Sequence, residues 1–222
     1  MFSLSLSAFR ARFALTAFTF AVAFLCPFAW AQSSADLFKM IDLDRPAEVR
    51  SLLLKGVKPD VVDERGDSAL VVASRTGLLP IAQMLVEAGA KVSLRNKWGD
   101  TALMVAALNG QEKVVRYLRD KGGDVNNTGW TALHYAAVNG HADIAKYLLD
   151  QGANPVASSP NGISPLMMAA RENKTEVIKV LLEYGADLAQ KNDKGETAYD
   201  WALREEHKPA IDMLKKALAS AR

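Results

Sequence analysis

The sequence has a single cysteine, Cys26, and none of the common catalytic motifs. Cys26 lies inside an apolar N-terminal run, so a chain without that run has no disulfide, no thiolate metal site and no cysteine nucleophile. A Gly-x-Ser-x-Gly elbow, a His-Glu-x-x-His helix and a phosphate-binding glycine loop are all missing. These absences predict a protein that is not an enzyme and that uses no cofactor.

Net charge is also nearly absent. The chain has 27 lysines and arginines against 25 aspartates and glutamates, and Arg10 and Arg12 precede the apolar run. Without those two arginines the balance is 25 to 25 (27 minus 2), and the sequence has no long basic stretch. Because binding to a phosphate backbone depends on clustered cations, we expect no nucleic-acid partner.

The N-terminal segment has the pattern of a cleaved signal peptide. Two arginines precede the 16-residue run Phe13–Phe28, and Ala29-Trp30-Ala31 then places small residues at alternate positions. We expect residues 1–31 to be the signal peptide and residues 32–222 to form the mature chain. The alternatives are a retained membrane anchor, for which the run is short, and a lipid anchor on Cys26, which follows a leucine instead of a small residue.

The rest of the chain repeats one short pattern of residue types. In its clearest copy Thr131 can cap a first helix, and Gly140 can end that helix in the left-handed conformation. Apolar residues at 144, 145, 148 and 149 then predict a second helix that ends at Gly152. Neither helix can bury its apolar stripe alone, so the unit requires neighbours.

The unit recurs at a nearly fixed period, which is the signature of a stacked-repeat protein. Five units begin at Ser68, Thr101, Thr131, Ser164 and Thr197, at intervals of 33, 30, 33 and 33 residues. The pattern resembles the ankyrin repeat, whose consensus of Thr-Pro-Leu-His, Ala-Ala, Gly, Val-Leu-Leu and Gly-Ala-Asp fits nearly every register position over residues 36–218. The resemblance implies an all-α repeat solenoid of helix-turn-helix units joined by β-hairpin fingers.

The register divides a single domain, 32–222, into about six units. The outer two mix polar residues into the helical pattern, as expected of capping repeats whose outer sides face water. The N-terminal cap covers 36–66, the four full repeats cover 67–99, 100–129, 130–162 and 163–195, and the C-terminal cap covers 196–218.

The one short interval falls on the finger at 124–129. Losing three residues shortens a two-stranded finger by ~5 Å at the usual rise per residue. We therefore expect a notch in the row of fingers. A functional notch and neutral drift in a surface loop both remain open.

The three histidines have structural explanations. His134 occupies the Thr-x-x-His position, where the resemblance implies hydrogen bonds that tie neighbouring repeats. His141 follows the inter-helix glycine. His207 stands beside Glu205 and Glu206, which hold a metal ion only weakly without a third ligand. We expect no metal site.

The resemblance also implies a concave binding surface, formed by the fingers and by one side of each first helix. Matching of motif positions predicts the partner-binding residues Trp98, Asp100, Val105, Leu108, Trp130, Tyr135, Val138, Ile163, Met168 and Arg171. The same surface would include Arg65, Asp67, Val72, Arg75, Lys97, Trp201 and Arg204. Aromatic, methionine and arginine side chains are enriched at interfaces, and a large apolar patch marks an interaction site. The alternative is that the tryptophans pack across adjacent fingers and stiffen the row.

These patterns predict a non-enzymatic protein-interaction module that binds one protein partner as a monomer. Similarity to exported bacterial ankyrin repeat proteins favours the periplasm, with no membrane attachment after signal cleavage. One alternative is an accessory or immunity-type protein that protects or inhibits a periplasmic enzyme. Another is a small-ligand or metal-binding protein that uses the groove beside the short finger.

Overall fold

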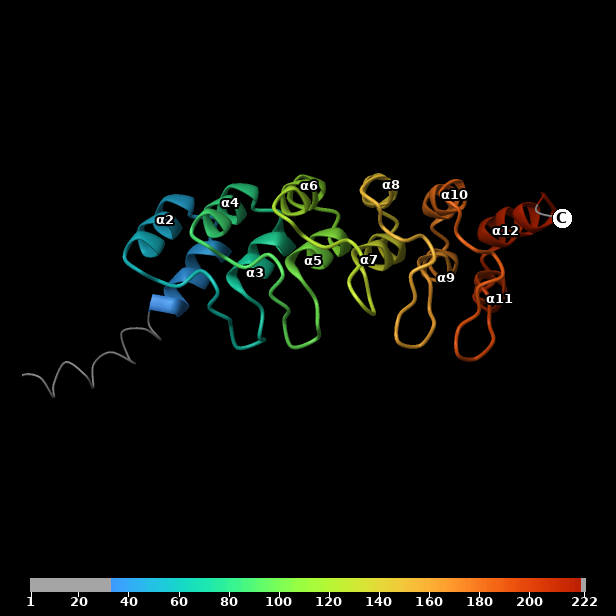
Figure 1. Ribbon diagram of the computed structural model, residues 1–222, viewed down its shortest axis with the longest axis horizontal. Helices are drawn as coiled ribbons and strands as arrows, with labels where there is room; N and C mark the ends of the chain where they lie inside the picture. Colours follow the sequence, from blue (N-terminus) through green and yellow to red (C-terminus); the bar gives the residue numbers. More distant parts are fainter. Residues whose placement is uncertain (1–32, 221–222) are drawn as a thin grey trace, which may run out of the picture.

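The computed structural model describes residues 33–220, which form a single row of stacked helix pairs (Figure 1). The row opens with a helical segment at 33–42 followed by α2 (Pro46–Leu54). The first helices of the later pairs are α3 (Ala69–Thr76), α5 (Ala102–Leu108), α7 (Ala132–Asn139), α9 (Pro165–Arg171) and α11 (Ala198–Arg204). Their second helices are α4 (Leu79–Glu87), α6 (Glu112–Asp120), α8 (Ala142–Asp150), α10 (Thr175–Glu183) and α12 (Lys208–Ser220). The predicted signal peptide lies outside the described residues.

The ends of the first helices follow the sequence signals. The N-cap hydroxyl of each first helix accepts a hydrogen bond from the backbone N–H three residues later, at Ser68, Thr101, Thr131, Ser164 and Thr197. Gly77 and Gly140 end α3 and α7 with φ of +75° and +81°. Asn173 takes the place of this glycine after α9 with φ of +54°, because asparagine tolerates the left-handed region better than other side chains.

The helices form two layers. Each first helix packs against the first helices of its neighbours, and each second helix lies behind its own first helix (Figure 1). One leucine from each full repeat is buried between the layers, at Leu70, Leu103, Leu133 and Leu166. Ala73, Ala106, Ala136 and Ala169 are fully buried, and these small side chains let adjacent first helices approach closely. Burial of each leucine stabilises the stack by roughly 2 kcal/mol. The prediction of an all-α repeat solenoid is confirmed.

The fingers are the loops that connect successive pairs, at 57–66, 91–99, 124–129, 154–162 and 187–195, numbered first to fifth. We expected β-hairpins, but within residues 33–220 strand pairing is limited to one bridge between Val62 and Ser68. The four longer fingers instead reverse through a turn with two backbone hydrogen bonds, such as those from the Asn96 N–H to the Asp100 carbonyl (2.9 Å) and from the Gly99 N–H to the Asn96 carbonyl (3.0 Å). These bonds fix a turn without building a ladder.

The third finger, 124–129, is visibly shorter than its neighbours (Figure 1). No backbone bond of the kind that closes the other four fingers is found in it, within the part of the chain that the structure describes. The row of tips is therefore interrupted in front of α7, as the short sequence interval predicted. In the same described region, none of the helices combines the length and apolar character needed to cross a bilayer.

Candidate functional site

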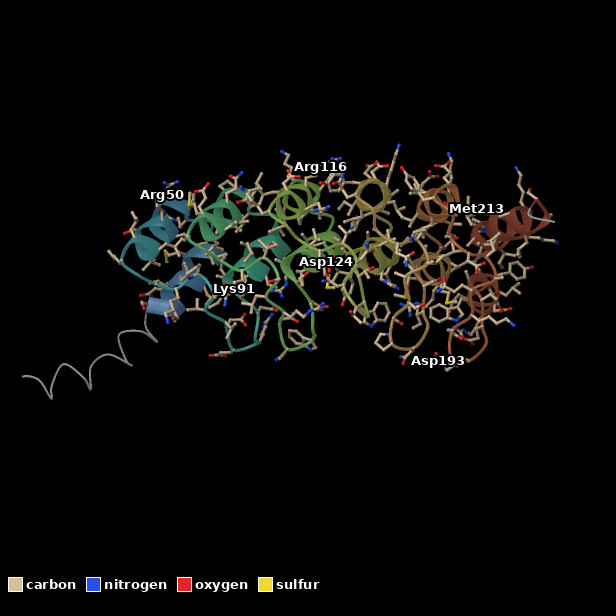
Figure 2. All side chains as sticks on the ribbon, in the orientation of Figure 1. Arg50, Lys91, Arg116, Asp124, Asp193 and Met213 are labelled. Carbon is tan, nitrogen blue, oxygen red and sulfur yellow. The ribbon has the colours of Figure 1, made fainter. Side chains whose placement is uncertain are left out.

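The fingers and the first helices together form one side of the stack, which we call the finger face. The second helices form the opposite side. In Figure 2, Arg116 lies on the second-helix side and Asp193 lies at the tip of the last finger, at opposite edges of the stack. The partner-binding residues predicted from the sequence all belong to the finger face or to the layer beneath it, since they come from fingers and first helices.

A row of residues at the bases of the fingers links each repeat to the next. In the second repeat, Asp67 is fully buried and accepts hydrogen bonds from Arg75 and from the Asn96 amide (2.8 Å). At the equivalent place in the third repeat, Asp100 accepts a hydrogen bond of 2.6 Å from the Tyr135 hydroxyl of the fourth. Each of these carboxylates thus links the base of one finger to the next finger or first helix.

Trp130 and Tyr135 form the centre of the finger face together with Asp100. The Trp130 ring lies 6.2 Å from the Tyr135 ring at 25° and 5.2 Å from the His134 ring at 71°. Burial raises the pKa of Tyr135, and the hydrogen bond to the Asp100 carboxylate raises it further. The protonated Tyr135 hydroxyl is the group that donates to Asp100. The structure brings these three predicted residues together as a packed cluster.

His134 anchors the same cluster from below. Its Nδ1 accepts the Thr131 backbone N–H at 3.2 Å, so its Nε2 carries the proton and donates to the Ile163 carbonyl at 2.9 Å. Burial lowers the pKa of His134 to about 4, and the bond to Ile163 only partly opposes this. The imidazole is neutral and ties the fourth repeat to the fifth. This is the role that the resemblance implied.

A groove of about 520 Å³ lies at the C-terminal end of the finger face. Ile163 and Arg171 line it from one repeat, and Trp201 and Arg204 line it from the C-terminal cap. The two guanidinium carbons lie 5.7 and 5.4 Å from the Trp201 ring, which is itself only 5% exposed. Both guanidinium groups are paired with carboxylates, Arg171 with Glu172 (2.8 Å) and Arg204 with Glu196 (2.7 Å), so the groove has paired charges above a buried ring.

Glu196 organises that groove. One of its carboxylate oxygens accepts the Asn192 amide and the Trp201 indole N–H, each at 2.8 Å, while the other accepts Arg204 at 2.7 Å. Hydrogen bonds from Asn192 and Trp201, with Arg204 adding to them, lower the pKa of Glu196. Sequence reasoning missed Glu196 and Asn192. Their signal was available, because Asn192 repeats the position of Asn96 in an earlier finger.

Two predicted partner-binding residues are buried, and the prediction that they are exposed is wrong. Val105 and Met168 are each only 6% exposed. The reason is that α5 packs between α3 and α7, and α9 packs between α7 and α11, so these side chains fill the spaces between first helices. Val72 is buried in the same way, at 7%. None of the three presents a surface to a partner.

The other predicted residues differ in how far they are available. Leu108 and Val138 are half-buried at the ends of their first helices, and the Leu108 carbonyl accepts the Asn139 amide at 2.6 Å. Ile163 and Arg171 are half-buried in the C-terminal groove. Of the ten predicted residues, Trp98 alone is exposed, two are buried and the other seven are half-buried.

Trp98 lies at the tip of the second finger. Its side chain is 60% exposed, and the Lys97 ammonium lies 4.5 Å from the centre of its ring. The Asn96 side-chain oxygen accepts the backbone N–H groups of Trp98 (3.0 Å) and Asp100 (2.9 Å), which fixes the turn that carries the indole. Several large apolar side chains are exposed over residues 33–220, and among them Trp98 is the only aromatic one.

Over residues 33–220, no three histidine, cysteine, aspartate or glutamate side chains are grouped so that they could hold a metal ion. The His207 side chain and its glutamate neighbours are thus not part of such a group.

A row of stacked helix pairs with buried polar links between repeats and one accessible finger face defines a solenoid scaffold for protein interaction. The family model for ankyrin repeats (3 copies) matches residues 79–159 and 154–221, which together cover more than half of the chain. The protein belongs to the ankyrin repeat family. Such repeats are a protein-interaction module, and the family is typically non-enzymatic. No curated protein matches the chain.

Proposed function

We propose that the protein binds one partner protein through its finger face, as a monomer, after export to the bacterial periplasm. The observation that carries the proposal is the exposure of Trp98, 60% of whose side chain faces solvent on a rigid turn. Tryptophan is one of the residue types most enriched among interface hot spots. The C-terminal groove around Trp201 supplies a second contact region on the same face.

Export is supported by the sequence pattern at the N-terminus, where Ala29-Trp30-Ala31 follows an apolar run. Expression of the full chain in a bacterium, followed by mass spectrometry of the periplasmic fraction, tests this part. We expect a mature chain that begins at Gln32. A membrane-bound product that retains Met1 would contradict it.

The binding face is tested with the partner that cross-linking and mass spectrometry recover from the periplasm. In calorimetric titration, Trp98→Ala and Arg171→Ala should each weaken binding by ~2 kcal/mol, the scale of an interface hot spot. Lys146→Ala and Lys179→Ala, on exposed positions of α8 and α10, serve as controls on the opposite side. If only the lysine variants lose affinity, the partner binds the second-helix side.

The same partner separates simple docking from an accessory or immunity-type role. If it is an enzyme, its activity is measured with and without a stoichiometric amount of the ankyrin protein. A change in turnover that disappears with Trp98→Ala would identify the finger face as the inhibitory or protective surface.

A further inference from the structure

We infer that the second finger, 91–99, docks an acidic segment of the partner protein and that the Trp98 indole anchors it. The inference rests on the proposed function, because it assigns a partner chemistry to the finger face. It follows from three features of this finger, which are its charge, its open flank and its rigidity.

The second finger is the cationic part of the row. It carries Lys91, Arg95 and Lys97, all exposed, and no acidic residue. Among the residues that the structure describes, Asp60 alone lies within ion-pair distance of these cations, 4.0 Å from the Lys91 ammonium. The cations thus present a local positive potential that attracts carboxylates and orients an approaching partner.

The neighbouring fingers do not extend this charge. The first finger holds Asp60, Asp63 and Glu64 against Lys58 and Arg65, a net charge of −1, and the third holds Asp124 and no basic residue. A nucleic acid requires cations that follow its backbone over several phosphates, and acidic groups on both sides interrupt such a track. A short acidic peptide segment fits one cationic finger, so the charge pattern favours a protein over a nucleic acid.

The flank of Trp98 is open because the third finger is short. With three residues fewer, the finger at 124–129 does not reach the level of the second finger tip (Figure 1). Trp98 therefore has no tip of equal height on that side and remains 60% exposed. The notch gives an extended segment a place to pass beside the indole.

The tip is also rigid. Asn96 holds the backbone of Trp98 and Asp100, and the Arg95 guanidinium donates to the Gly99 carbonyl at 2.5 Å. A pre-organised anchor loses little conformational entropy on binding. The expected ligand is a segment in which an apolar residue contacts the indole and aspartate or glutamate residues on either side face Arg95 and Lys97.

The test uses a library of random peptides displayed on phage and the mature protein recovered from a host that expresses the full chain. Peptides selected by the protein are synthesised with a fluorescent label, and affinities are measured by anisotropy. We expect aspartate and glutamate to be enriched around an apolar residue. Trp98→Ala, and separately the double variant Arg95→Glu with Lys97→Glu, should each weaken binding at least about tenfold. Higher salt should weaken wild-type binding in the same direction.

Lys146→Glu on α8 is the matched charge-reversal control and should leave the peptide affinity unchanged. Melting curves verify that each variant folds. Selected peptides that lack acidic enrichment but lose affinity with Arg171→Ala would overturn this inference and leave the finger-face proposal standing. A pool that stays unenriched overturns it as well. Tight binding of single-stranded DNA that the same double variant abolishes would replace the acidic peptide with a nucleic acid.

Discussion

The second and third fingers each place a tryptophan beside a glycine, yet the two indoles have opposite environments. Trp98 precedes Gly99 and is 60% exposed at the tip of its finger. Trp130 follows Gly129 and packs over the His134 and Tyr135 rings. Both glycines have positive φ, +87° and +84°, so the backbone reverses at the same point in each finger. The two tryptophans therefore stand on opposite sides of the same turn, and this position, together with the height of the adjacent finger, sets their exposure.

The two fingers also differ in what orders them. In the second finger, the Asn96 side chain binds the finger's own backbone. In the third, the Asn126 amide donates to the Gly152 carbonyl (2.8 Å), and its oxygen accepts the Asn154 N–H (2.8 Å), both in the following repeat. Each finger also has the other kind of contact: the Asn96 amide donates to Asp67, which follows the first finger (2.8 Å), and Asp124 accepts the Asn126 N–H (2.9 Å) within the short finger. The Asn96 side chain thus acts mainly within its own finger, whereas the Asn126 side chain acts between repeats. The four predictions that follow test this difference.

The largest expected effect is at His134, which supports the third finger from below. His134→Ala removes the bond to the Ile163 carbonyl and leaves a cavity under Trp130, so the free energy of unfolding should fall by ~3–5 kcal/mol. His134→Met restores the residue type that the repeat before it has at Met104, and should recover part of the loss. Urea denaturation followed by circular dichroism measures both. Equal stability of the alanine variant and wild type would show that the histidine tie is dispensable.

Low pH should lower the free energy of unfolding through His134, the residue that supports the third finger. The pKa of His134 is lowered to about 4 in the folded chain, below the usual value of 6.5. Between these two values the unfolded chain binds more protons, so stability is complete above pH 6.5 and decreases as the pH falls towards 4. The decrease attributable to His134 should reach up to about 3 kcal/mol. Comparison of wild type with His134→Met at several pH values isolates it from the carboxylates, and parallel curves would contradict it.

The two tryptophans give the most direct comparison. Trp130→Ala should lower the free energy of unfolding by ~2–3 kcal/mol, because its ring packs on two neighbours in a partly buried cluster. Trp98→Ala should change it by less than ~0.5 kcal/mol, as expected for an exposed side chain. Thermal or urea melts of the two single variants measure the difference. Similar losses for both would mean that Trp98 packs against other fingers and stiffens the row.

Much of this arrangement was predictable from the sequence because it depends on local chemistry. The hydroxyl N-caps, the Asn173 turn and the histidine tie each follow from residues close in sequence or from a repeat register. The burial of Val105 and Met168 does not, since it is set by how closely neighbouring first helices approach. The same holds for the strand content of the fingers, where a turn with two backbone hydrogen bonds replaces a ladder.

Hydrogen bonds between residues far apart in the sequence were also not predictable from it. The hydrogen bond between Tyr135 and Asp100 joins residues 35 positions apart, and nothing in either repeat alone places a hydroxyl opposite that carboxylate. The exposures of Trp98 and Trp130 likewise depend on finger length and on the height of adjacent tips. In a repeat protein, sequence therefore predicts the unit better than it predicts the surface between units.

The smallest and most local prediction concerns the two asparagines. Asn96→Ala removes three hydrogen bonds, two within its own finger and one to the buried Asp67 carboxylate, and should cost ~1–2 kcal/mol. Asn126→Ala removes two bonds to exposed backbone groups of the next repeat and should cost ~1 kcal/mol or less.

Hydrogen exchange distinguishes the effects of the two asparagine variants more sharply than the free energy of unfolding does. The reason is that an amide that loses its acceptor exchanges faster through local opening. With Asn96→Ala, faster exchange should appear at the Trp98 and Asp100 amides, inside the same finger. With Asn126→Ala, it should appear at the Asn154 amide, one repeat away, while Trp98 is unchanged. Acceleration confined to residues 124–129 in the second variant would show that the Asn126 side chain acts within its own finger, and the contrast between the two fingers would then reduce to the positions of their tryptophans.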